Sequence, residues 1–123
     1  MDQFYYNVRA KFPDGTEMMF DSITAPKDYT GQDYLRDYAI LSVKPGNCHP
    51  EITLDVKPAY HIIDDCGTDT YTESFYHRKK ALDTARDAFR SLTRNDLLCR
   101  NAFYVIHGDI DRPDTWTIIK KYL

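Results

Sequence analysis

The chain has 123 residues, of which 42% are hydrophobic, 28% charged and 14% aromatic, and its net charge is −3. This length suits one domain, and the composition supplies a core, which excludes a disordered, collagen-like or coiled-coil chain. The longest stretch free of Asp, Glu, Lys and Arg has eight residues, Asn101 to Gly108, so no segment is expected to span a membrane. The chain does not open on a basic region followed by an apolar run, and we therefore expect no signal peptide.

Residues 4–12 are expected to form a strand because apolar and polar side chains alternate along them. The inward face is expected to hold Phe4, Tyr6, Val8, Ala10 and Phe12, and the outward face Tyr5, Asn7, Arg9 and Lys11. The sequence Pro13-Asp14-Gly15-Thr16 is typical of a turn. Residues 17–22 should then return beside the first strand, which makes this hairpin the first predicted unit.

The middle of the chain contains three shorter strand patterns. Residues 39–43 form a brief apolar run, residues 52–56 alternate, and residues 60–63 are apolar again, while residues 32–37 allow at most a short helix. Pro58 separates the second pattern from the third. Since proline cannot donate to a strand ladder, Pro58 indicates a bulge, an edge or a change of strand.

One long helix is predicted over residues 71–92. Thr70-x-x-Glu73 has the form of a capping box at its start. An apolar stripe follows at helical spacing, made of Phe75, Leu82, Ala85, Phe89 and Leu92. Such a helix would be about 30 Å long. Residues 102–107 and 116–122 are the last two predicted strands.

This order of elements predicts an α+β fold, with a single domain over residues 1–123. We expect an antiparallel sheet of about five strands with the helix 71–92 packed across one face. The order of the strands in the sheet does not follow from the sequence.

The cysteines indicate a reducing environment. Cys48, Cys66 and Cys99 are an odd number without a close pair, whereas a secreted disulfide scaffold needs an even set. We therefore expect free thiols and a cytoplasmic protein. No Cys-x-x-Cys or His-x-x-x-His spacing occurs, so neither a metal site nor a cofactor is expected. A nucleophile beside a histidine base is normally assembled from distant segments, and the sequence leaves this open.

Charge is distributed unevenly along the chain. Residues 1–77 carry 6 Lys or Arg and 13 Asp or Glu, whereas residues 78–100 carry 7 and 3. The acidic part includes two tyrosine-containing stretches, residues 28–38 and 64–73. Tyrosine supplies rigid contact area at recognition surfaces, and carboxylates among the rings would suit a basic groove.

The principal functional hypothesis is therefore a non-enzymatic protein-binding module. Its expected partner-binding residues are Asp28, Tyr29, Asp33, Tyr34, Asp37, Asp64, Asp65, Asp69 and Tyr71. A short, acidic chain without motifs is similar in composition to phage and mobile-element inhibitors of host defence, including anti-CRISPR proteins. That similarity implies a protein partner that handles nucleic acid, occupied through its basic groove. The net acidity argues against direct binding of nucleic acid, and no membrane contact is expected.

Two alternatives remain open from the sequence. The basic helix could bind nucleic acid through phosphate contacts, with Arg78, Lys79, Arg86, Arg90 and Arg94 as candidates. Asp55-Val56-Lys57 resembles the Asp/Glu-x-Lys core of restriction-endonuclease-like nucleases. That resemblance implies metal-dependent cleavage by Asp55 and Lys57, with a remote acid from Asp37, Glu51 or Asp64.

Overall fold

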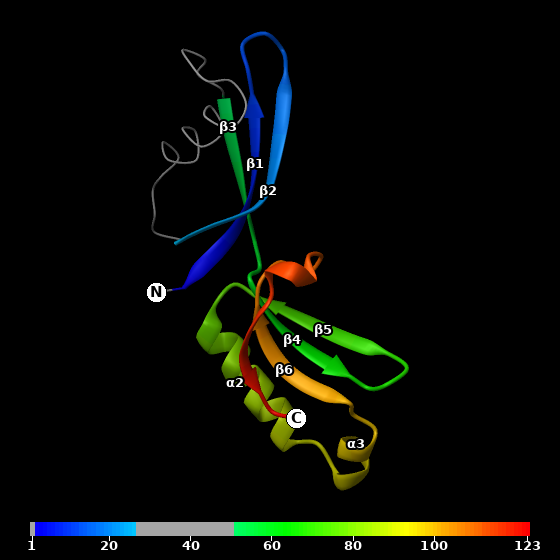
Figure 1. The fold of residues 1–123 in the computed structure, drawn as a ribbon. Helices are drawn as coiled ribbons and strands as arrows, with labels where there is room; N and C mark the ends of the chain where they lie inside the picture. The colour runs from blue at the N-terminus through cyan, green and yellow to red at the C-terminus, as the bar shows by residue number, and fades with distance from the viewer. Residues whose placement is uncertain (1, 27–50) are drawn as a thin grey trace. The chain divides into compact units, whose positions relative to one another are not determined.

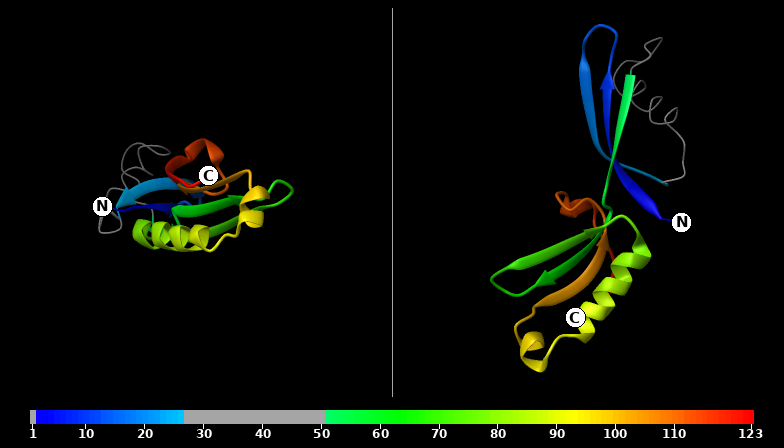
Figure 2. Two further views of the ribbon diagram at one scale, coloured as in Figure 1. Left: turned by 90° about the horizontal axis from the view of Figure 1, so that it is seen from below. Right: turned by 180° about the vertical axis from the view of Figure 1, so that it is seen from behind.

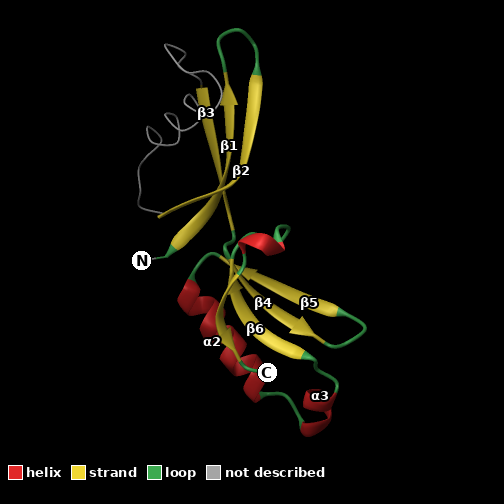
Figure 3. Ribbon diagram, in the orientation of Figure 1, coloured by secondary structure: helices red, strands yellow, loops and turns green. Residues whose placement is uncertain are grey.

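The computed structural model describes residues 2–26 and 51–123, which form two compact units, Met1–Lys57 and Pro58–Leu123 (Figure 1). The described strands form two antiparallel sheets, one in each unit, and the main helix lies in the second unit (Figure 3). The α+β class and the antiparallel pairing are therefore confirmed, although the strands divide between two sheets of three and four strands rather than one of about five. A single domain over residues 1–123 stays a prediction. In the part of the chain that the structure describes, no helix is long and apolar enough to cross a membrane.

The first unit is a three-stranded sheet with the order β2-β1-β3. Its strands are β1 (Gln3–Lys11), β2 (Glu17–Pro26) and β3 (Glu51–Lys57). The predicted first hairpin is confirmed, with a return strand longer than expected. Gly15 has φ +89°, and the Asp14 carboxylate accepts a hydrogen bond from the Thr16 amide at 2.9 Å, as this turn chemistry requires. The expected helix at 32–37 and strand at 39–43 lie outside the described residues.

The predicted inward face of β1 is buried, because alternate residues of a central strand all point to one side of the sheet. Phe4, Tyr6, Val8, Ala10 and Phe12 are between 0% and 6% exposed. Ile52 and Leu54 of β3 pack against them from the neighbouring strand. Tyr5 was expected on the outward face and is nevertheless only 5% exposed. It has Thr24 on one side and Lys57 on the other, since β1 is the central strand.

The second unit is a four-stranded sheet with the order β5-β4-β6-β7. Its strands are β4 (Tyr60–Asp65), β5 (Thr70–Phe75), β6 (Ala102–His107) and β7 (Thr117–Lys121). Its helical segments are α2 (Arg78–Arg90), α3 (Arg94–Leu98) and the short turn η1 (Pro113–Thr115). Pro58 lies between β3 and β4, which belong to different sheets, so the predicted change of strand is confirmed.

The prediction of a helix over residues 71–92 is wrong at its start. Residues 70–75 form β5, and α2 begins only at Arg78. Thr70, Tyr71, Thr72 and Phe75 are β-branched or aromatic, and they pair with β4 in a hairpin, which outweighs the local capping pattern. The capping box lies instead at α3, where Thr93 and Asp96 cap each other. The helix α2 is accordingly about 20 Å long.

The two faces of the second sheet are covered by different segments. On one face, Ala81 and Ala85 of α2 are fully buried. The Phe89 ring packs beside the rings of Phe103 and Tyr122 at centroid distances of 5.5 and 5.4 Å. Figure 2 (left) shows the chain around η1, in orange, on the opposite side of this sheet from α2. The side chains of β4 therefore meet the helix on one face and this turn on the other.

Candidate functional site

The β4–β5 hairpin contains the partner-binding residues predicted in the acidic stretch 64–73. Asp64 differs from the others because it forms an ion pair within the chain. The Asp64 carboxylate accepts hydrogen bonds from Arg100 at 3.1 and 3.3 Å, and both side chains are 17% exposed. The hydrogen bond from Arg100 to Asp64 raises the pKa of that guanidinium. Arg100 therefore offsets the charge of Asp64 within the chain, and a contact between Asp64 and a partner stays a prediction.

Three other predicted residues, Asp65, Asp69 and Tyr71, lie on the hairpin. Asp65 accepts a hydrogen bond from the Gly67 amide at 2.9 Å and shapes the turn. Asp69 is exposed, and the Tyr71 ring is 60% exposed. Glu73, which the sequence reasoning did not select, is also exposed and lies on the same side of β5 as Tyr71. We call Asp69, Tyr71 and Glu73 the hairpin surface.

The strand β5 is the outer strand of its sheet and has no second neighbour among the strands that the structure describes. Every residue from Thr70 to Ser74 is exposed. A strand in this position offers its unpaired amides and carbonyls to another chain. The remaining predicted contact residues, in the first acidic stretch, lie outside the described residues: Asp28, Tyr29, Asp33, Tyr34 and Asp37.

The basic helix carries less free charge than its sequence indicates. Lys79 is 2.9 Å from Asp83, and Arg86 lies 3.7 Å from Asp83 and 3.3 Å from Asp87. The hydrogen bond from Lys79 lowers the pKa of Asp83. Of the other three predicted residues, Arg78 and Arg90 lie on α2 and Arg94 begins α3. Acidic neighbours thus offset the charges of Lys79 and Arg86, both of which were proposed to contact phosphate.

The predicted nuclease pair lies at a sheet edge in the first unit. Asp55 and Lys57 point to the same side of β3, where they lie opposite Asn7 and Tyr5 of β1. Of the acids considered as a remote ligand, Asp64 is paired with Arg100, and Asp37 lies outside the described residues. Within residues 2–26 and 51–123, no three His, Cys, Asp or Glu side chains gather closely enough to hold a metal ion.

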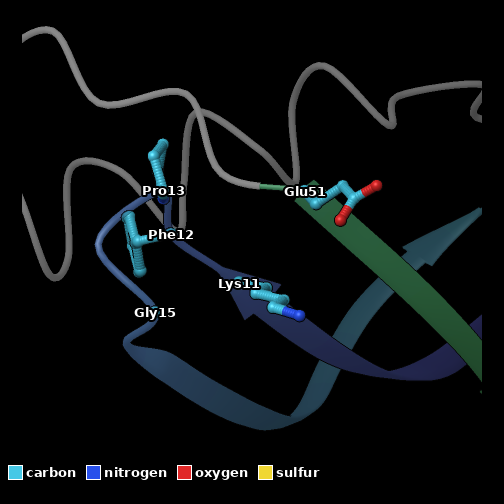
Figure 4. Close-up of a pocket in the computed structure, with 5 residues that line it drawn as sticks. All are labelled: Lys11, Phe12, Pro13, Gly15 and Glu51. Atoms are coloured by element: carbon cyan, nitrogen blue, oxygen red, sulfur yellow. The ribbon is translucent and has the colours of Figure 1, made fainter.

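A hollow of about 340 Å³ lies at the β1–β2 turn of the first unit. Figure 4 shows its lining, which comes from the end of β1, the turn that follows it and the first residue of β3: Lys11, Phe12, Pro13, Gly15 and Glu51. Lys11 and Glu51 are partners in the register of β1 and β3, so these opposite charges lie on the same face of the sheet. Among the described residues of this lining, no nucleophile lies beside a base.

A buried histidine in the second unit is hydrogen-bonded to a serine on the neighbouring strand. His61 of β4 is 1% exposed, and Ser74 is its cross-strand partner on β5. Ser74 Oγ lies 2.8 Å from His61 Nδ1, and the Gly108 carbonyl oxygen lies 3.1 Å from His61 Nε2. A carbonyl oxygen only accepts, so Nε2 carries the ring proton and Nδ1 accepts the Ser74 hydroxyl.

The turn after β6 holds this histidine in position. The backbone carbonyl of Asp109 accepts a hydrogen bond from the Trp116 indole at 2.6 Å, and its carboxylate accepts one from the Asp111 amide at 3.1 Å. Burial lowers the pKa of His61, with His107 acting in the same direction. The carbonyls of Gly108 and Pro58 and the charge of Asp109 oppose that shift.

The sequence reasoning did not select His61 and Ser74, because it placed residue 74 in the helix. A strand over residues 70–75, joined to β4 by a short turn, would have paired Ser74 with His61 directly. The alternation of Tyr71, Glu73 and Phe75 with Thr and Ser residues was the available signal.

The fold defines a small α+β protein with two antiparallel sheets. Comparison with known proteins adds no name to this class, because no family model, curated protein or solved structure matches the chain.

The lowered pKa of His61 predicts that stability depends on pH near neutrality. The unfolded chain has the ordinary histidine pKa of 6.5, whereas the folded pKa is lower. Between these two values the unfolded state binds more protons, so the free energy of unfolding should fall as the pH falls below 6.5. Urea titrations at pH 7.5 and 5.5 measure this decrease.

The variant His61→Gln is the control for this pH dependence, because glutamine does not titrate. The difference between wild type and His61→Gln isolates His61 from the other histidines. Asp83 and Asp96 have lowered pKa values and act only below the ordinary aspartate value of 3.8. Equal pH dependence in both proteins would contradict the prediction.

Proposed function

We propose that this chain is a protein-binding module that docks its hairpin surface against a basic partner. The observation that carries this proposal is the exposed Tyr71 ring, 60% accessible on an outer strand between Asp69 and Glu73. A tyrosine in this position contributes a rigid, amphipathic contact at little entropic cost. The two carboxylates supply the complementary charge.

The hairpin is held rigidly enough to act as a docking element. Asp64 and Arg100 join β4 to the chain that follows α3, and the Asn101 amide donates a hydrogen bond to the Asp65 carbonyl at 2.8 Å. Gly67, with φ +90°, closes the turn between the strands. Because these contacts order the hairpin before binding, the partner does not bear the cost of ordering it.

The acidic charge of this surface supports a basic partner. Tyrosine rings stack on the stems of arginine and lysine, and carboxylates occupy positions that phosphates take in a nucleic-acid groove. We therefore propose a protein that handles nucleic acid as the partner, inhibited by occupation of its basic groove. The free thiols of Cys66 and Cys99 support a reducing, cytoplasmic setting for this interaction.

Co-purification with a tagged full-length chain from its native source tests the proposal. We expect a captured protein whose yield falls about tenfold or more in the double variant Asp69→Lys/Glu73→Lys and also falls in Tyr71→Ala, since a tenfold change needs only about 1.4 kcal/mol. Capture should weaken as the salt concentration rises, because the attraction involves exposed charges.

The matched control is Asp111→Lys/Asp114→Lys, which changes the net charge equally. Both of these acids are exposed in the same unit and follow β6, at the far end of the sheet from the hairpin turn. This control should retain the partner. If both charge-reversal variants lose the partner equally, or if neither does, the hairpin surface is not the docking site.

A further inference from the structure

We propose that Ser74 is an acyl-accepting nucleophile and that His61 is its general base. This inference concerns a chemical activity and does not rest on the docking proposal. Ser74 and Tyr71 are three positions apart on β5, so their side chains point to opposite faces of the strand. Ser74 faces the side on which His61 lies, whereas the hairpin surface faces the other side.

Ser74, His61 and the Gly108 carbonyl supply the three parts that an activated serine requires: a nucleophile, a base and a group that orients the base. Ser74 Oγ donates to His61 Nδ1 at 2.8 Å, and His61 Nε2–H donates to the Gly108 carbonyl at 3.1 Å. The second hydrogen bond fixes the tautomer, so the nitrogen that faces the hydroxyl is the one able to accept its proton.

The base of this pair is buried, whereas the nucleophile is an exposed residue. His61 is 1% exposed and is held between β5 and the turn after β6. Ser74 lies on the outer strand and is an exposed residue, and the hydrogen bond between its hydroxyl and His61 is only partly buried. Because burial lowers the pKa of His61, its imidazole is neutral and able to act as a base at neutral pH.

The reaction is the transfer of an acyl group from a small activated ester. Ser74 Oγ attacks the acyl carbon while its proton moves to His61 Nδ1, and a new Oγ–carbon bond forms. The bond between the acyl carbon and the leaving oxygen breaks, and the leaving group departs with the proton from Nδ1. The products are the Ser74 ester and the free alcohol or phenol, with no net oxidation or reduction.

The test is covalent labelling of the full chain with p-nitrophenyl acetate and, separately, with a fluorophosphonate. The acetylated or phosphonylated residue is located by peptide mass. We expect Ser74 to react, and Ser91 serves as the internal reference. Ser91 is also exposed, but its Oγ donates to the Asp87 carbonyl at 2.9 Å, an acceptor that cannot take a proton as a base does.

Two variants separate the roles of the pair. Ser74→Ala should lose the label at this position and keep any labelling of Ser91. His61→Gln should slow acylation of Ser74 by about 100-fold or more, the usual contribution of a general base, and leave Ser91 unchanged. Docking of the protein partner should survive Ser74→Ala, so the two proposals fail independently.

The pH profile gives a readout that needs no variant and therefore does not depend on how His61→Gln folds. In wild type, the rate at Ser74 should rise with deprotonation of His61 and level off by pH 7, because its pKa lies below 6.5. An unassisted serine continues to gain reactivity with hydroxide. Equal rates at Ser74 and Ser91, or a Ser74 rate that climbs steadily to pH 9, would overturn the proposal.

Discussion

Replacing Ile106 with alanine is expected to lower the free energy of unfolding of the second unit by about 2–5 kcal/mol. Ile106 is 0% exposed and lies on β6, between its partners His61 on β4 and Ile118 on β7. Truncation removes buried methyl groups and leaves a cavity that a paired central strand cannot close. Since a domain of this size has only about 5–15 kcal/mol of stability, this variant should be close to unfolding.

Ile118→Ala is the matched control, because Ile118 is the same residue type and the direct partner of Ile106 on the neighbouring strand. Ile118 is 57% exposed, so its truncation should cost less than about 1 kcal/mol. Trp116 is the single tryptophan of the chain and lies in the second unit, so its fluorescence during urea denaturation reports on that unit. Comparable losses of unfolding free energy in the two variants would contradict the prediction that burial sets the cost of truncation.

Gly108→Ala should destabilise the second unit by about 1–3 kcal/mol, the usual cost of overpacking a closed site. A methyl group at Gly108 would lie 2.9 Å from the Trp116 Cα and 3.0 Å from the Thr115 carbonyl oxygen. These are backbone atoms, so the turn itself must move. Denaturant titration compared with wild type measures the loss.

Gly67→Ala is the control within the same unit. Gly67 has φ +90°, and a methyl group there would meet only the Asn101 side chain, at an ordinary 3.5 Å. Its cost should be limited to backbone strain of about 1–2 kcal/mol. Only Gly108→Ala should also slow labelling of Ser74, because the Gly108 carbonyl orients His61. If both variants slow labelling equally, a general loss of stability would explain the effect.

The two proposed activities use opposite faces of one hairpin. Tyr71 and Glu73 point to the face that carries α2, and Ser74 points to the face that carries the turn around η1. Variants on one face can therefore be assayed for the other activity as folded proteins. This separation makes each proposal a control for the other.

The strands that follow from the sequence are those whose burial is set by local alternation. The inward residues of β1, such as Val8 and Ala10, were predicted because every second residue of a half-buried strand is apolar. β3 was predicted on the same pattern, and the turn at Gly15 on its residue types. In each case a short window of sequence contains the physical cause.

The start of α2 shows where local reasoning fails. Thr70-x-x-Glu73 satisfies the rule for a capping box, and Phe75 continues the helical stripe. Pairing with β4 satisfies the backbone of residues 70–75 along a whole strand, which a cap at one helix end does not. Tyr5 is a similar case, since its burial depends on having strands on both sides.

The amino-acid sequence alone determined the α+β class, the first hairpin and an exposed Tyr71 among acidic residues, because each depends on residue type and spacing. Tertiary structure alone decided that Asp64 is neutralised by Arg100, 36 positions away, and that Ser74 meets His61 and the Gly108 carbonyl. These contacts are set by strand register and by the path of the turn after β6. The free energy of these contacts depends on distances between segments that are far apart in the sequence. A local pattern of residues does not predict those distances.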